Sequence, residues 1–266
     1  DQTNDYSRDP DFTAYAEYNK ITLYYKGKLI WGTPPTGATE AEQMTITQQP
    51  ETSTAGVTMS PAPTVFLEDA FGDPVAGVDI TVSLNKNSFS GGSTTVVSTS
   101  SNGLAIFDNL RMSAAHNNYR ITFSANAPLI GDLNSAFFDV THADPDNMVV
   151  TTQPAAETIA GEVITPAPAV QLTDAFGNPV PGTNITVTLN KYVFESGTTT
   201  VATNASGIAQ FNDLIITQAA ENFIMTFNAD AAGVDNVNSS SFNIATAAPD
   251  HMTIITQPQE SVTEGT

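Results

Sequence analysis

Two aspartates, Asp144 and Asp146, flank a proline in the stretch His142-Ala-Asp-Pro-Asp-Asn147. Carboxylates are ligands that Ca²⁺ prefers, and the ion takes about six to eight oxygen ligands. The pair is therefore a candidate Ca²⁺ site, with backbone carbonyls and water supplying most of the coordination. A solvated polar linker stiffened by proline accounts for the same residues. Apart from this ion, the sequence predicts no cofactor.

Motifs for catalysis are absent from the sequence. It contains no His-Glu-x-x-His, no Gly-x-Ser-x-Gly and no glycine-rich phosphate loop followed by lysine. The three histidines, His116, His142 and His251, do not recur at matching places in the repeats described below. The chain also has no cysteine, which excludes disulfides and thiolate metal sites. We therefore expect a protein that is not an enzyme.

The charge of the chain narrows the range of partners. Its formal net charge is −20 at pH 7. Nucleic acids and anionic membranes attract basic surfaces, so neither is an expected partner. No apolar run approaches the roughly 18 residues that a membrane-spanning helix needs, so we expect no membrane insertion in this segment.

The sequence repeats itself from Met44 onward. Met44, Met148 and Met252 each begin a short stretch that ends in Gln-Pro, for example Met44-Thr-Ile-Thr-Gln-Gln-Pro50. The repetition predicts four parts. They are residues 1–43, a β-rich segment that ends a preceding domain or packs on the first repeat; residues 44–147, repeat 1; residues 148–251, repeat 2; and residues 252–266, the first strand of a third repeat or a donated strand.

Each repeat contains a turn followed by an alternating strand, over residues 69–85 and 174–190. Alternation with period two and β-branched residues is typical of a half-buried strand. Positions that stay apolar in both repeats are expected in the core, whereas Phe66 and Ile106, which become glutamine in repeat 2, are expected to face solvent or a partner. The predicted core residues are Val82, Leu84, Phe107, Phe123, Val187, Leu189, Phe211 and Phe227.

The strand pattern indicates the fold class. Each repeat offers about seven short strands with turn signals between them, in roughly 100 residues, which is typical of a two-sheet sandwich. We therefore predict an all-β protein made of tandem Ig-like β-sandwiches in an elongated multi-domain chain.

The motifs of residues 44–266 resemble those of a known family. Asp174-Ala-Phe-Gly-Asn-Pro-Val-Pro-Gly182, the strand after it and Asn204-Ala-Ser-Gly-Ile-Ala-Gln-Phe211 are similar to the bacterial immunoglobulin-like repeats of the invasin and intimin adhesins. The resemblance implies an extracellular place on the bacterial cell surface. It also implies a stalk or spacer role in an adhesin, in contact with neighbouring repeats, while host or surface glycans are bound by domains outside this chain.

Two other functions remain open at this stage. Met252, Ile254 and Ile255 form an apolar strand without later strands to pair with, so the chain is a candidate subunit of a filament in which identical subunits exchange strands. The aromatic residues Trp31, Phe66 and Tyr192 leave room for a third function, that of a carbohydrate-binding module.

Overall fold

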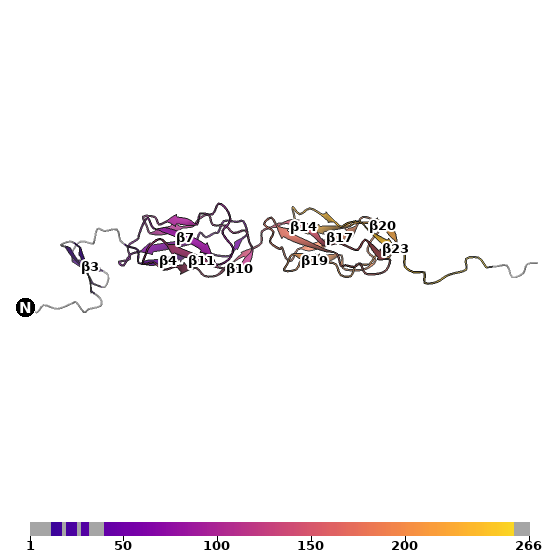
Figure 1. The fold of residues 1–266 in the computed structure, drawn as a ribbon, viewed down its shortest axis with the longest axis horizontal. Helices are drawn as coiled ribbons and strands as arrows, with labels where there is room; N and C mark the ends of the chain where they lie inside the picture. Colours follow the sequence, from indigo (N-terminus) through magenta and orange to yellow (C-terminus); the bar gives the residue numbers. More distant parts are fainter. Residues whose placement is uncertain (1–11, 18–19, 26–27, 32–39, 258–266) are drawn as a thin grey trace, which may run out of the picture. The chain divides into compact units, whose positions relative to one another are not determined.

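The computed structural model describes residues 12–17, 20–25, 28–31 and 40–257, with side chains placed from residue 40 onward (Figure 1). Every regular element in these residues is a β-strand. Within the same residues, no helix has the length and apolar character needed to cross a bilayer. The chain divides into two compact units, Asp1–Thr141 and His142–Thr266, and each is described by itself.

Three strands of unit 1 precede repeat 1. They are β1 (Phe12–Glu17), β2 (Lys20–Tyr25) and β3 (Lys28–Trp31), which form an antiparallel sheet in the order β1-β2-β3. The side chains of these strands lie outside the described residues, so the expected role of residues 1–43 stays a prediction.

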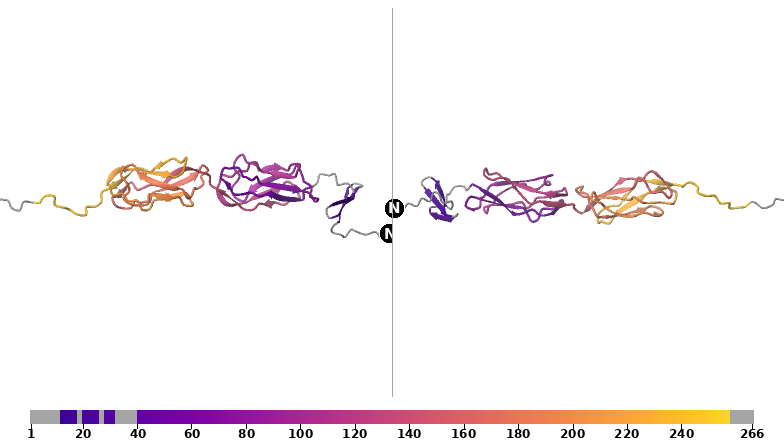
Figure 2. Two further views of the ribbon diagram at one scale, coloured as in Figure 1. Left: turned by 180° about the vertical axis from the view of Figure 1, so that it is seen from behind. Right: turned by 90° about the horizontal axis from the view of Figure 1, so that it is seen from below.

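Repeat 1 is built from three small sheets. Figure 2 shows the ribbon from two further sides. The first sheet is β4-β6-β9 and the second is β12-β11-β7-β8. The third is β10-β13-β5, in which β13 and β5 run parallel. Arg120 alone separates β10 from β11, so the second and third sheets continue one another. The bounds are β4 (Gln43–Gln48), β5 (Ser53–Thr54), β6 (Thr64–Glu68), β7 (Asp79–Leu84), β8 (Val96–Ser98), β9 (Leu104–Ile106), β10 (His116–Tyr119), β11 (Ile121–Ala125), β12 (Leu133–Asn134) and β13 (Phe138–Thr141).

Repeat 2 has the same three sheets in the same strand order: β14-β16-β19, β18-β17-β21-β22 and β15-β23-β20. The strand that opens each repeat, β4 or β14, lies at the edge of its sheet. The proline after it has no N–H to donate, and at an edge no neighbouring strand needs that hydrogen bond. The bounds are β14 (Pro145–Thr152), β15 (Glu157–Ile159), β16 (Ala169–Asp174), β17 (Asn184–Leu189), β18 (Thr200–Ala202), β19 (Ile208–Gln210), β20 (Ala220–Phe223), β21 (Met225–Ala229), β22 (Val237–Asn238) and β23 (Phe242–Ala245).

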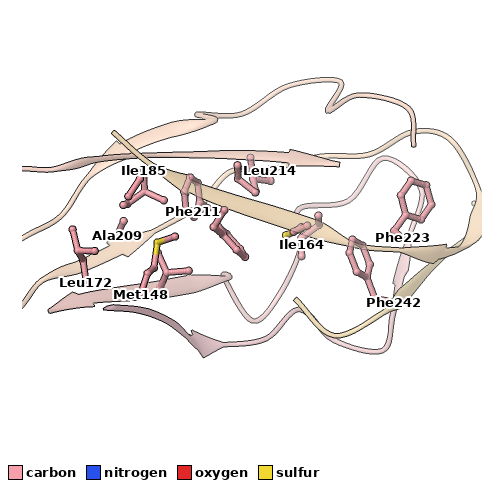
Figure 3. Packing of buried hydrophobic residues seen from close by; sticks show 14 of the residues in the cluster. Met148, Ile164, Leu172, Ile185, Ala209, Phe211, Leu214, Phe223 and Phe242 are labelled. Carbon is pink, nitrogen blue, oxygen red and sulfur yellow. The ribbon is translucent and has the colours of Figure 1, made fainter. Parts of the chain in front are cut away.

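The prediction of tandem Ig-like β-sandwiches is confirmed, because each repeat packs its sheets around an apolar core of its own. In repeat 2 the core joins Met148 and Leu172 of the first sheet to Ile185 of the second, and Phe211 belongs to the same cluster (Figure 3). The alternating exposure of β7 and β17 shows that one face of each strand lies in the core of its own repeat. The boundaries proposed at residues 43, 147 and 251 stay predictions.

The structure places six of the eight predicted core residues in the interior. Val82, Phe107 and Phe123 are buried in repeat 1, and Val187, Phe211 and Phe227 are buried in repeat 2. Leu84 and Leu189 are half-buried, since each is the last residue of its strand.

The two residues expected on the outside behave differently from one another. Ile106 is exposed, as expected. Phe66 is half-buried, because its ring lies over Gly103: a Cβ atom added to this glycine would be 2.9 Å from Cε2 of Phe66 and 2.6 Å from the carbonyl oxygen of Leu67. Gly103 has a φ of +71°, so both its backbone conformation and its close packing require glycine.

Truncating the central aromatic of either core should destabilise that repeat strongly. We expect Phe107→Ala and Phe211→Ala each to lower the free energy of unfolding by about 3–5 kcal/mol, because each leaves a large cavity in a closed core. Phe66→Gln, which installs the residue of repeat 2, should cost about 1 kcal/mol or less. Urea denaturation followed by circular dichroism measures the three values. An equal loss for Phe66→Gln would show that the ring over Gly103 belongs to the core.

Candidate functional site

A buried carboxylate holds the turn after β16. Asp174 is only 2% exposed. Its Oδ1 accepts hydrogen bonds from the backbone N–H groups of Phe176 (2.9 Å) and Asn178 (2.8 Å). Its Oδ2 accepts one from the side-chain amide of Asn178 (2.8 Å) and one from the backbone N–H of Ala143 (2.8 Å). The carboxylate thus ties the turn to the chain just before β14.

The hydrogen bonds keep Asp174 charged. Burial raises the pKa of this carboxyl. The side-chain amide of Asn178 and the backbone N–H groups of Ala143, Asn178 and Phe176 lower the pKa by more than burial raises it. The net effect is a pKa below the ordinary value for aspartate. A charged carboxylate in the fold is therefore stabilised by its donors.

Very little chain separates this anchored point from repeat 1. The carbonyl oxygen of Thr141 accepts a hydrogen bond from the N–H of Ala55 (2.9 Å) and so belongs to repeat 1. Ala143 is bonded to Asp174 of repeat 2. His142 is thus the single residue between the two attachments. Sequence reasoning missed this arrangement, because the partners are 31 residues apart in the chain.

The turn after β6 repeats the arrangement only in part. Asp69 is 5% exposed, and its Oδ1 accepts hydrogen bonds from the N–H groups of Phe71 (2.9 Å) and Asp73 (3.0 Å). Its Oδ2 is buried and has no hydrogen-bond partner in the part of the chain that the structure describes. Asp73 stands where repeat 2 has Asn178, and a carboxylate cannot donate the missing bond.

The aspartates that the sequence singled out for Ca²⁺ lie on the surface. Asp144 and Asp146 are both exposed, on either side of the first residue of β14, Pro145. Within residues 40–257, no three histidine or acidic side chains converge as a metal site. The Ca²⁺ site at these two aspartates stays a prediction.

A surface hollow of about 360 Å³ lies in repeat 2 between β17 and the loop that follows it. Its lining has hydroxyl and apolar side chains and no charged residue. Tyr192, which the sequence analysis noted as an aromatic, is 57% exposed there, with its ring 6.0 Å from that of Phe223. The lining residues are Thr186, Val187, Thr188, Leu189, Tyr192, Val193, Phe194 and Thr199.

The segment proposed for strand exchange carries no strand over residues 252–257, and Met252, Ile254 and Ile255 are all exposed. Strand donation through these residues stays a prediction. Trp31 is the last residue of β3, and its side chain lies outside the described residues.

Comparison with known proteins adds a match near the start of the chain. Residues 1–32 match the family described as cellulose binding domain. An uncharacterised protein from the celA 5′ region of Paenibacillus lautus is 44% identical over 34 residues, which are 13% of this chain and 23% of that protein. The match thus spans about a quarter of the relative's length.

Among solved structures, the chain is similar to Ig-like domains of the invasin and intimin adhesins, as the sequence motifs predicted. The D0–D1 domain of intimin is 14% identical, with a TM-score of 0.31, over 77% of this chain and 98% of that one. InvD of Yersinia pseudotuberculosis is 15% identical, with a TM-score of 0.41, over 86% and 78%. The fibronectin(III)-like modules of CbhA from Clostridium thermocellum are 13% identical, with a TM-score of 0.26, over 80% and 99%. These likenesses are distant, and the description of the fold rests on the sheets themselves.

Replacing the buried carboxylate should make the stability of repeat 2 less dependent on pH. Because the pKa of Asp174 is lowered in the folded state, its contribution is complete above the unfolded pKa of about 3.9 and disappears as the pH falls through the lower folded pKa. We expect Asp174→Asn to cost about 2–3 kcal/mol at pH 7, since hydrogen bonds to a charge are lost. The difference from the unmodified chain should shrink between pH 4 and pH 2.

Urea denaturation at each pH measures this difference. Asp144→Asn is the control, because its carboxylate is exposed and its replacement should change stability by about 0.5 kcal/mol or less at pH 7. A penalty for Asp174→Asn that is the same at pH 7 and pH 2 would contradict the role of the charge.

Proposed function

We propose that the two repeats are a non-catalytic spacer in an extracellular bacterial protein, joined to a cellulose-binding domain of which residues 1–32 form part. The observation that carries this proposal is the tandem of two sandwiches, each with a closed core, connected through the single residue His142. The match of residues 1–32 to a cellulose binding domain supports the proposed place of the repeats next to such a domain.

The connection explains how such a tandem keeps its reach. A flexible linker lets two domains approach each other, whereas a linker of one residue leaves few backbone dihedral angles to vary. The linker is this short because Asp174 holds Ala143 in repeat 2 and β13 holds Thr141 in repeat 1. Spacing of this kind needs no ligand and no reaction, only two sandwiches that remain folded.

The same construction suits the stalk of a surface adhesin, as the sequence motifs suggest. The match at residues 1–32 favours a protein that acts on or attaches to plant cell-wall polysaccharide over one that binds a host cell. In both settings the repeats separate a binding domain from the rest of the protein.

Carbohydrate binding by this chain itself is a second candidate, because residues 1–32 include the aromatic residue Trp31. Stacking of an aromatic ring on the flat face of a sugar is a common way to hold a neutral glycan. The exposed ring of Tyr192 in repeat 2 provides an internal comparison.

The spacer proposal predicts a narrow distance distribution between the repeats. Since the chain has no cysteine, Asn102→Cys and Ser206→Cys give one exposed dye position in each repeat. Single-molecule energy transfer should show a narrow distribution. Insertion of Gly-Ser-Gly-Ser after His142 should broaden it, because the linker is then flexible. Equal widths with and without the insertion would contradict the spacer mechanism.

The carbohydrate-binding candidate predicts retention on microcrystalline cellulose. If residues 1–32 hold the binding surface, the full chain should be retained, and Trp31→Ala should lower the retained fraction at least several-fold. Tyr192→Ala should leave retention unchanged, because this exposed ring lies in repeat 2. Passage of the unmodified chain through the cellulose would exclude binding by this chain while leaving the spacer proposal standing.

A further inference from the structure

The turns after β6 and β16 share one backbone scaffold. In each, the N–H of the first aspartate donates to the carbonyl of the residue four positions on, at 3.0 Å for Asp69 and Asp73 and 2.9 Å for Asp174 and Asn178. In each, Oδ1 of the aspartate accepts two backbone N–H groups of its own turn. Since Oδ1 is held in the same way in both, Oδ2 points in the same direction relative to the turn.

The two turns differ in what meets that Oδ2 atom. In repeat 2 the side-chain nitrogen of Asn178 lies 2.8 Å from Oδ2 of Asp174, and Ala143 donates a second bond. In repeat 1 Oδ2 of Asp69 is buried with no hydrogen-bond partner in the described part of the chain. A buried, unpaired carboxylate oxygen is costly, so it requires a compensating group.

Negative charge gathers at the same turn of repeat 1. Glu68, Asp69 and Asp73 stand where repeat 2 has Thr173, Asp174 and Asn178. Glu68 reaches over the turn, because a Cβ atom added to Gly72 would lie 3.9 Å from its Oε2. Nothing lies within 4 Å of the equivalent position on Gly177. Repeat 1 therefore has two carboxylates, Glu68 and Asp73, where repeat 2 has the neutral residues Thr173 and Asn178.

We propose that this turn of repeat 1 binds a divalent cation, with Oδ2 of Asp69 and the carboxylate of Asp73 as its protein ligands, and that repeat 2 does not. Asp73 is exposed, and turning its side chain into the place held by the Asn178 amide brings its carboxylate to Oδ2 of Asp69. A hard cation with oxygen ligands, of which Ca²⁺ is the probe, then replaces the missing donor.

The site is expected to be weak and to suit an extracellular protein. No three acidic or histidine side chains converge on a metal position in residues 40–257, so water must complete the coordination. Sites of extracellular modules with few charged ligands bind Ca²⁺ with dissociation constants of roughly 0.1–1 mM. The inference does not depend on the spacer function.

Nuclear magnetic resonance of the full chain tests the proposal with a control inside the same molecule. Titration with CaCl₂ at pH 7 should shift the backbone amide signals of Phe71 and Asp73 with saturation near 1 mM, because both amides donate to Asp69. The corresponding amides of Phe176 and Asn178 should not move. NaCl of equal ionic strength should reproduce none of the shifts.

Exchanging one residue between the repeats gives matched variants. Asp73→Asn installs the residue that repeat 2 uses, so the fold should persist while the affinity for Ca²⁺ falls at least tenfold. Asn178→Asp places a carboxylate beside Asp174 and should make the Phe176 amide respond to Ca²⁺.

Two results would overturn the proposal. The first is the absence of a saturable shift at Phe71 and Asp73 up to 10 mM CaCl₂. The second is an unchanged titration in Asp73→Asn, which would place the cation elsewhere, with Asp144 and Asp146 as the other candidate ligands.

Discussion

A buried aspartate that accepts backbone N–H groups is the interaction on which each repeat depends. A turn leaves several N–H groups without a strand partner, and each would be costly inside the protein. Asp69 and Asp174 each satisfy two of them with one carboxylate oxygen. The turn then delivers β7 or β17 to the sheet in the register that places Val82 or Val187 in the core.

The second oxygen of the same carboxylate extends this role to the connection between repeats. Oδ2 of Asp174 accepts a hydrogen bond from the N–H of Ala143. The turn after β16 therefore also holds a residue that precedes the first strand of repeat 2. The side chain of Asp174 thus has two roles: it closes a turn inside repeat 2, and it leaves only His142 between the hydrogen bonds of the two repeats. The same residue closes the turn of repeat 2 and holds the first residues of that repeat.

The sequence predicted the fold because the pattern of each strand is local. Period two predicted Val82 in the core, and comparison of the repeats predicted Phe107 in the core and Ile106 outside. Val82 and Phe107 are buried and Ile106 is exposed. The ring of Phe66 over Gly103 and the bond from Ala143 to Asp174 were not predictable, since each joins residues far apart in the chain. Charge spacing directed attention to Asp144 and Asp146, whereas the unpaired oxygen of Asp69 is visible only in three dimensions.

Some differences between the repeats replace both residues of a contacting pair, and others replace only one of them. Asn87 donates to the hydroxyl of Tyr119 at 2.7 Å, and repeat 2 has Tyr192 packed against Phe223 in the same two places. Both members changed, so one contact replaces the other, although Tyr192 keeps the left-handed φ of 56° that suits asparagine better. At Asp73 only one member changed, because its partner is aspartate in both repeats. A change with no compensating partner among the described residues is the kind that a bound ion would explain.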